Sequence, residues 1–168
     1  KVIRITLRFR ERFWGDLSPD GKHTLDNMGF LFTLDEQFPT WWTMAPEYVP
    51  IITAWAPFRA AETLSGQTAF VVLASALDSL SHELNFDRQK MEDLLDSAFT
   101  HDWQSDPFAL GAYSYVKVGG AHSPDVLSEP VDEKLFFAGE ATDAAHTGTV
   151  HGAIASGHRA AEQIVRAR

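Results

Sequence analysis

The sequence has 168 residues, and 45% of them are hydrophobic, including 12 Phe and 5 Trp. This composition is sufficient for a packed core and excludes a disordered chain. The net charge of −9 argues against a nucleic-acid-binding surface, which needs clustered Lys and Arg. Cysteine is absent, which excludes disulfides, thiolate metal ligands and a cysteine nucleophile.

The N-terminal residues carry no targeting signal, and no apolar run approaches the roughly 18 residues that span a bilayer. The sequence opens on Lys1 without an initiator Met, in a pattern typical of the middle of a strand. We therefore expect a fragment or a processed subunit. A cytoplasmic location fits the lack of cysteine.

Alternating apolar and polar residues over 2–9 predict a half-buried strand. Three more strands, separated by prolines, are predicted over 28–34, 40–44 and 49–55. We expect Trp41, Trp42 and Trp55 to pack in the core of the sheet. The first third of the chain therefore predicts a sheet meander.

Apolar residues at helical spacing predict two amphipathic helices in the middle of the chain. The first is marked by Phe70, Leu73, Ala74, Leu77, Leu80 and Leu84. The second is marked by Met91, Leu94, Leu95, Ala98 and Phe99. We expect both apolar stripes to face the core.

The C-terminal part reads as a loop, a strand and a helix. A Gly-rich aromatic segment over 108–120 leads into a loop rich in Ser, Pro, Asp and Glu. A strand is predicted over 134–138, and a helix from about 149 to 166. The apolar face of that helix is expected to include Val150, Ala153, Ile154, Gly157, Ala161, Ile164 and Val165.

Common catalytic motifs are missing from the sequence. It has no P-loop, no Gly-x-Gly-x-x-Gly and no Gly-x-Ser-x-Gly. Glu140, Asp143, His146 and His151 lie on a turn and a helix start without a known metal-ligand spacing. We therefore expect no metal site.

The predicted last strand delivers Gly139 and Glu140, and the helix start that follows, over 148–152, has almost no bulk. Glycines let the main chain approach a ligand, and the N–H groups of a helix start attract a negative group or a carbonyl oxygen. Glu140 would accept hydrogen bonds from ligand hydroxyls. The alternative is a helix packed closely on a sheet through Gly152 and Gly157, and the residues alone leave both possibilities open.

Four regions of the sequence can be compared with known families, and the last two of them are long and specific. They are Arg-Phe-Trp-Gly-Asp (12–16), Thr-Ala-Trp-Ala (53–56), His-Asp-Trp-Gln-Ser-Asp-Pro-Phe-Ala-Leu-Gly-Ala-Tyr-Ser-Tyr (101–115), and Leu-Phe-Phe-Ala-Gly-Glu-Ala-Thr (135–142) with Gly-Thr-Val-His-Gly-Ala (148–153). Together they resemble the flavin-dependent amine oxidases, which include monoamine oxidases, polyamine oxidases and lysine-specific histone demethylases. The resemblance covers essentially the whole chain.

The resemblance implies FAD as the cofactor. Some members attach it to a Cys at the place of Ala112, so binding here is expected to be non-covalent. The cofactor-binding residues that the resemblance implies are Gly139 and Glu140 along the ribityl–phosphate arm, Gly148 at the helix start, and Thr149 and Val150 at the flavin.

Three residues are implied at the reacting centre. Tyr113 matches one wall of the aromatic cage that flanks the amine, and Thr149 stands at the opposite wall. Trp103 matches a Trp near the reactive edge of the flavin, although a core role for it remains open.

The family's Gly-x-Gly-x-x-Gly turn, and the Lys that holds a water at the flavin, are expected upstream of this chain, because neither Lys1 nor Lys117 matches that Lys. The implied partner is therefore the upstream FAD-binding portion of the same enzyme. The implied fold is α+β, with part of a substrate-domain mixed β-sheet and its helices over 1–107. Over 108–168 we expect the C-terminal strand and helix of a Rossmann-like FAD-binding domain.

The implied function is oxidation of an amine C–N bond to an imine, with O2 reduced to H2O2 and a small amine as substrate. The chain by itself is expected to be inactive. An L-amino-acid oxidase is one alternative, but it needs an Arg for the substrate carboxylate, and the sequence places none clearly. A non-catalytic module that retains the fold is the other alternative.

Overall fold

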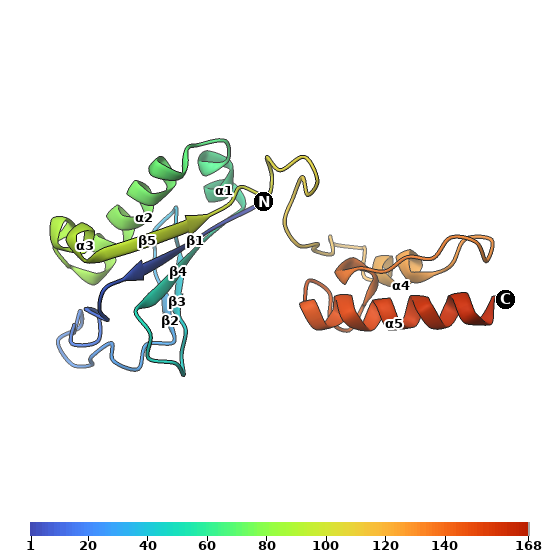
Figure 1. The fold of residues 1–168 in the computed structure, drawn as a ribbon, viewed down its shortest axis with the longest axis horizontal. Coiled ribbons are helices and arrows are strands. Elements are labelled where there is room, and N and C mark those ends of the chain that lie inside the picture. The colour runs from blue at the N-terminus through green and yellow to red at the C-terminus, as the bar shows by residue number, and fades with distance from the viewer. Residues whose placement is uncertain (168) are drawn as a thin grey trace. The chain divides into compact units, whose positions relative to one another are not determined.

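Residues 1–167 are described here from a computed structural model (Figure 1). The chain divides into two compact units, unit 1 (Lys1–Ala112) and unit 2 (Tyr113–Arg168), and each is considered by itself. The assignment of 1–107 to substrate binding and of 108–168 to FAD binding stays a prediction. Within the described residues, no helix combines the length and apolarity needed to cross a bilayer.

Unit 1 is built on a five-stranded sheet with the order β2-β3-β4-β1-β5. The strands are β1 (Val2–Phe9), β2 (Phe30–Phe32), β3 (Thr40–Thr43), β4 (Ile51–Pro57) and β5 (Leu95–Thr100). Every neighbouring pair is antiparallel, so the part of the predicted mixed sheet that lies in this chain contains no parallel pair within the described residues. The α+β class itself is confirmed.

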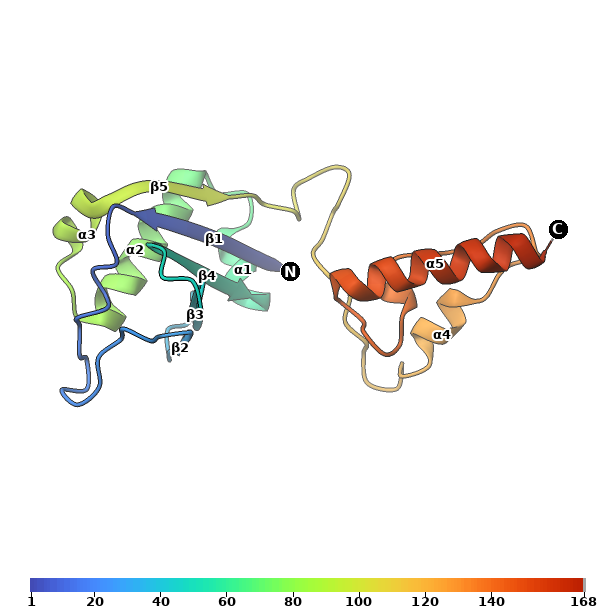
Figure 2. The ribbon, with the colours of Figure 1, turned by 60° about the horizontal axis from the view of Figure 1, so that its bottom comes forward.

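Three helices complete unit 1: α1 (Phe58–Leu64), α2 (Ala69–Leu84) and α3 (Arg88–Leu94). The helices α1 and α2 pack on one face of the sheet (Figure 2). On that face, Ile3, Ile5 and Leu7 of β1 are almost fully buried, as their alternation predicts. Among the described residues of unit 1, no helix packs on the opposite face of the sheet.

The aromatic residues predicted to be in the core differ in burial. Trp41 is fully buried, whereas Trp42 and Trp55 are only partly buried. Phe70 is 77% exposed, so the prediction that it faces the core as part of the apolar stripe of α2 is wrong. It lies in the first turn of α2, where the buried residue is Val72 instead.

The second predicted helix, over 91–99, is wrong in its C-terminal half. Helix α3 ends at Leu94, and the next six residues form β5, which pairs with β1 from Ile5↔Thr100 to Phe9↔Leu95. A short apolar run can fit the spacing of a helix and of a strand equally well. The hydrogen bonds that residues 95–100 form along β1 outweigh their weak helical preference.

Unit 2 contains α4 (Ser123–Ser128), a 3-10 turn η1 (Glu140–Thr142) and α5 (Val150–Arg166). The predicted strand over 134–138 is not formed. One isolated bridge, Val131↔Leu135, is its only strand-like pairing among the described residues. A strand needs a neighbouring strand, and unit 2 supplies none within the described residues.

Helix α5 is confirmed, but the face it buries is not the predicted one. Its buried residues are Gly152, Ser156 and Ala160. The predicted apolar positions Val150 and Ile154 are exposed. The helix therefore packs within unit 2 through small side chains, which allow close approach of η1.

Candidate flavin site

The N-terminal end of α5 is formed by a capped turn. Thr149 is the N-cap residue, and its Oγ1 accepts a hydrogen bond from the Gly152 amide at 3.1 Å. The same hydroxyl donates to the His146 carbonyl oxygen at 2.6 Å. Val150 and His151 are the first two residues of the helix, so their amides have no intrahelical acceptor and are free to donate to a ligand. The macrodipole of a 17-residue helix favours a negative group there.

The small residue at position 152 has a packing cause. A Cβ on Gly152 would lie 2.4 Å from the carbonyl oxygen of His146, because the 146–149 turn folds back over the first turn of the helix. Gly157, by contrast, would have nothing within 4 Å of a Cβ. Close packing therefore explains the absence of a side chain at Gly152. Within the described residues it does not explain Gly157, which lies further along the helix.

Glu140 is the centre of a hydrogen-bonded clasp that joins three segments of unit 2. Its Oε1 accepts from the Ser114 amide at 2.9 Å, and its Oε2 accepts from Ser114 Oγ at 2.6 Å and from the Gly148 amide at 2.7 Å. Burial opposes ionisation of Glu140, but these bonds from Ser114 and Gly148 outweigh it and hold its pKa below the ordinary value. The carboxylate is thus kept charged, and about one lone-pair site remains for a ligand hydroxyl.

Gly139 adopts a positive φ of 144°, which favours glycine. Its amide donates to the buried Ser156 Oγ at 2.9 Å, and that hydroxyl donates to the Ala153 carbonyl oxygen at 2.7 Å. A Cβ on Gly139 would meet no atom within 4 Å. Among the described residues, the space in front of the Gly139 main chain is therefore open in the direction of a Cβ.

Tyr113 lies beside the clasp. A Cβ on Gly148 would be 3.9 Å from Tyr113 Cδ2, and the Tyr113 side chain is 51% exposed. Unit 2 thus brings together Tyr113, Glu140 and the consecutive residues Gly148, Thr149 and Val150, although Tyr113 lies 27 positions before Glu140. Trp103 belongs to unit 1.

Sequence reasoning missed Ser114. This residue makes two of the three bonds to Glu140, yet a Ser between two Tyr residues gives no local signal of a partner 26 positions away. Only the pairing of the Tyr-Ser-Tyr segment with the Gly-Glu segment would have indicated it.

Trp103 sits on a loop that Asp102 anchors to the α1–α2 turn. The Asp102 carboxylate accepts hydrogen bonds of 2.7 to 3.1 Å from Ser65 Oγ, the Gly66 amide, the Gln104 amide, Gln104 Nε2 and Ser105 Oγ. Trp103 itself is 52% exposed, and its ring centroid lies 4.3 Å from that of His101 in an edge-to-face arrangement. A purely buried role for Trp103 is therefore excluded within unit 1.

We expect the Trp103 loop to loosen in acid. Burial opposes ionisation of Asp102, but the hydrogen bonds from Ser105, Gly66 and Ser65 outweigh it and hold its pKa well below the usual value. A lowered folded-state pKa adds stability above the unfolded value near 3.9, and this stability is lost as the pH falls from there toward the folded value. The protection factor of the Gly66 amide, which is the exchange rate corrected for its intrinsic value at each pH, should therefore fall between about pH 4 and pH 2. In Asp102→Asn exchange should be fast already at neutral pH, and equal protection in both proteins would contradict the account.

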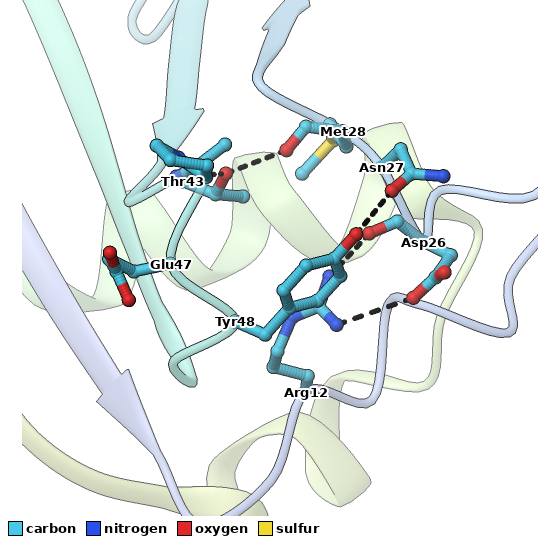
Figure 3. Close-up of a pocket in the computed structure, with 9 residues that line it drawn as sticks. Arg12, Asp26, Asn27, Met28, Thr43, Glu47 and Tyr48 are labelled. Carbon is cyan, nitrogen blue, oxygen red and sulfur yellow. Dashed lines mark hydrogen bonds and ion pairs between the residues drawn. The ribbon is translucent and has the colours of Figure 1, made fainter.

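A separate pocket in unit 1 surrounds Arg12, from the Arg-Phe-Trp-Gly-Asp motif (Figure 3). The Arg12 guanidinium donates to Asp26 Oδ1 at 3.3 Å and to the Asp26 carbonyl oxygen at 2.5 Å, and it lies 4.7 Å from the Tyr48 ring centroid. The Tyr48 hydroxyl donates to Asn27 Oδ1 at 2.5 Å. These polar groups satisfy one another around about 170 Å³ of space, so the motif has a structural role here.

Comparison with known proteins identifies the family of the chain. The family described as flavin containing amine oxidoreductase matches residues 1–165. The chain therefore belongs to the flavin containing amine oxidoreductases, as the motifs indicated, and a flavin is the cofactor of that family.

Individual relatives match shorter parts of the chain. Lysine-specific histone demethylase 1 homolog 2 of Oryza sativa subsp. japonica is 48% identical over 66 residues, which is 39% of this chain and 9% of that protein. Lysine-specific histone demethylase 1 homolog 2 of Arabidopsis thaliana is 50% identical over 64 residues, or 38% of this chain and 9% of that protein.

A solved structure matches almost the whole chain. Wild-type putrescine oxidase bound to putrescine has a TM-score of 0.75 and 22% identity, and the match covers 98% of this chain and 35% of that chain. The likeness shows the fold. The chain thus spans about a third of this solved enzyme and less than a tenth of those two curated relatives.

Proposed function

We propose that the chain is the C-terminal part of an FAD-dependent amine oxidase that converts an amine C–N bond to an imine, with O2 reduced to H2O2. The observation that carries the proposal is the grouping of Tyr113, the Glu140 clasp and the N-terminal end of α5 in unit 2. The upstream portion of the enzyme would complete the cofactor site.

The residues of unit 2 fit a flavin. When bound, FAD supplies the hydride acceptor for amine oxidation. The free amides of Val150 and His151 would donate to the electron-rich edge of the ring, and fixed donors stabilise the charge that builds there without reorganisation. The remaining acceptor site of Glu140 would bind a hydroxyl of the sugar chain, beside the open space at Gly139.

Tyr113 and Thr149 would orient the substrate. The half-exposed Tyr113 ring offers an apolar wall next to the helix start, whereas Thr149 uses its hydroxyl for the cap and presents little bulk. The space for the amine is therefore walled on one side. Because Ala112 cannot form a thioether bond, FAD would be released intact on denaturation.

Substitution of Tyr113 tests this assignment. In the full gene product, Tyr113→Ala should lower kcat/KM for amine oxidation roughly tenfold to hundredfold, since the wall that orients the amine is lost. Flavin absorbance per protein should stay unchanged. Peroxide release measures kcat/KM, and the ratio of flavin to protein absorbance measures the flavin content.

Tyr115→Ala is the matched control, because Tyr115 is also exposed and lies two residues away. It should leave kcat/KM within about twofold. A colourless full gene product would count against the oxidase and favour the non-catalytic module. Equal kinetic losses in the two variants would contradict the role of Tyr113.

A further inference from the structure

Arg159, on α5, is linked to the segment that carries Gly139 and Glu140. One terminal nitrogen of its guanidinium, Nη2, donates to Thr142 Oγ1 at 2.9 Å and to the Phe137 carbonyl oxygen at 3.1 Å. The Thr142 hydroxyl in turn donates to the Gly139 carbonyl oxygen at 2.9 Å. Two consecutive hydrogen bonds therefore connect Arg159 with the main chain of Gly139.

Gly139 is held at both its amide and its carbonyl group from one face of α5. Its amide donates to Ser156 Oγ at 2.9 Å, and its carbonyl oxygen is connected to Arg159 through Thr142. Ser156 and Arg159 are three positions apart, so their side chains lie on the same face of the helix. The two connections hold Gly139 at its positive φ of 144°, and this conformation sets the direction in which the main chain continues into Glu140.

The other terminal nitrogen of Arg159 fixes the orientation of the guanidinium. Nη1 donates to the Ser128 carbonyl oxygen at the end of α4 at 2.9 Å and to Gln163 Oε1 at 3.1 Å. The acceptors of Arg159 are all neutral, and within residues 1–167 no carboxylate forms an ion pair with it. An arginine with only neutral acceptors contributes the fixed geometry of its several donors rather than an ion pair. Arg159 therefore joins α5, the end of α4 and the 137–142 segment in one fixed arrangement.

We propose that Arg159 is a positioning residue for the cofactor, which holds Gly139 and Glu140 in the arrangement that binds the sugar–phosphate arm of FAD. This inference rests on the proposed function, in which Glu140 and the open space at Gly139 receive that arm. Arg159 acts through Thr142 and the main chain of Gly139. Supporting hydrogen bonds of this kind keep a binding group in its productive geometry, so their loss weakens binding without unfolding the protein.

Hydrogen exchange tests the positioning role without the cofactor. In the 168-residue chain, Arg159→Gln should lower the protection factor of the Gly139 amide roughly tenfold, because the segment loses one of its two connections to α5. Arg159→Lys should lower it only about threefold, since an ammonium can still donate to Thr142 Oγ1. The α5 amides should stay protected in both variants, which verifies that the helix is intact.

Titration of the apoprotein of the full gene product with FAD gives the second measurement. Arg159→Gln should raise the Kd of FAD roughly tenfold to hundredfold, and Arg159→Lys should raise it only about threefold. Thr142→Val removes the intermediate hydroxyl and should weaken FAD binding to a similar extent as Arg159→Gln. The double variant should bind FAD within about twofold of the weaker single variant, because both substitutions break the same connection.

Arg166→Gln is the matched control, since Arg166 lies on the same helix but pairs with the exposed Glu162 at 3.1 Å. It should leave both the Kd of FAD and the protection of the Gly139 amide unchanged. Equal FAD affinity in Arg159→Gln and the wild type, or independent losses in the double variant, would overturn the inference while leaving the oxidase function intact. If the protein oxidises no amine but its FAD affinity depends on Arg159 and Thr142 as expected, the oxidase proposal fails and the positioning role stands. A full gene product that binds no FAD would overturn both.

Discussion

Gly152→Ala is expected to destabilise unit 2 by about 3 kcal/mol, at the upper end of the cost of overpacking. The added Cβ would lie 2.4 Å from the His146 carbonyl oxygen, which is main chain and cannot rotate away. Either the 146–149 turn or the first turn of α5 must move, and the Thr149 cap would be lost with it. Hydrogen exchange of the α5 amides in the 168-residue chain measures this loss.

The matched control is Gly157→Ala on the same helix. A Cβ at Gly157 meets nothing within 4 Å, so the substitution should stabilise α5 by about 0.5–1 kcal/mol through helix propensity. Opposite signs for the two glycines are the expected result. If Gly152→Ala protected the α5 amides as well as Gly157→Ala does, the packing account of the helix start would be wrong.

Glu140→Ala is expected to cost about 2–3 kcal/mol in unit 2, because it removes the acceptor of three hydrogen bonds at once. The amides of Ser114 and Gly148 would lose their exchange protection together. In the full gene product the variant should also retain less flavin after gel filtration, since the clasp and the last acceptor site of Glu140 disappear together. Hydrogen exchange and the ratio of flavin to protein absorbance measure the two effects.

Ser114→Ala is the control for Glu140→Ala. It removes the 2.6 Å hydroxyl bond but keeps both amide bonds to Glu140, so it should cost only about 1 kcal/mol. Its flavin content should stay near that of the wild type. If Glu140→Ala kept full protection of the Gly148 amide, Glu140 would not be the link between these segments.

Acid should mimic the Glu140 substitution. The folded-state pKa of Glu140 is lowered, so its contribution to stability is present above the unfolded pKa and declines as the pH falls through the folded value. The wild-type protein should therefore lose this stability in acid, and Glu140→Ala, which lacks the carboxylate, should show no such loss.

Helix α5 illustrates what the sequence could predict and what it could not. The helix starts at Val150 because the hydroxyl of Thr149 caps it, and a Thr before a helical pattern predicts such a start from the sequence alone. The buried face depends on η1, which packs against the helix through the Gly139–Ser156 bond. Apolar periodicity cannot report such a contact, because the buried side chains are small.

Strand β5 shows the same limit in unit 1. Leu95, Ala98 and Phe99 fit a helical stripe as well as a strand, and only the free edge of β1 decides between them. The candidate site likewise has residues that the sequence could predict and a contact that it could not. Motif resemblance predicts Tyr113, Glu140 and Thr149 as site residues, but the clasp through Ser114 depends on a contact between distant segments.

The Ser156–Gly139 hydrogen bond fixes the rotational phase of α5 about its own axis. Each residue of an α-helix advances the azimuth by about 100°, so one residue inserted into or deleted from α5 between Gly152 and Ser156 would prevent Ser156 from facing Gly139 while Gly152 faces the His146 carbonyl oxygen. The length of that connection is therefore as constrained as its composition. Homologous sequences should accordingly tolerate substitutions in it far more readily than insertions or deletions.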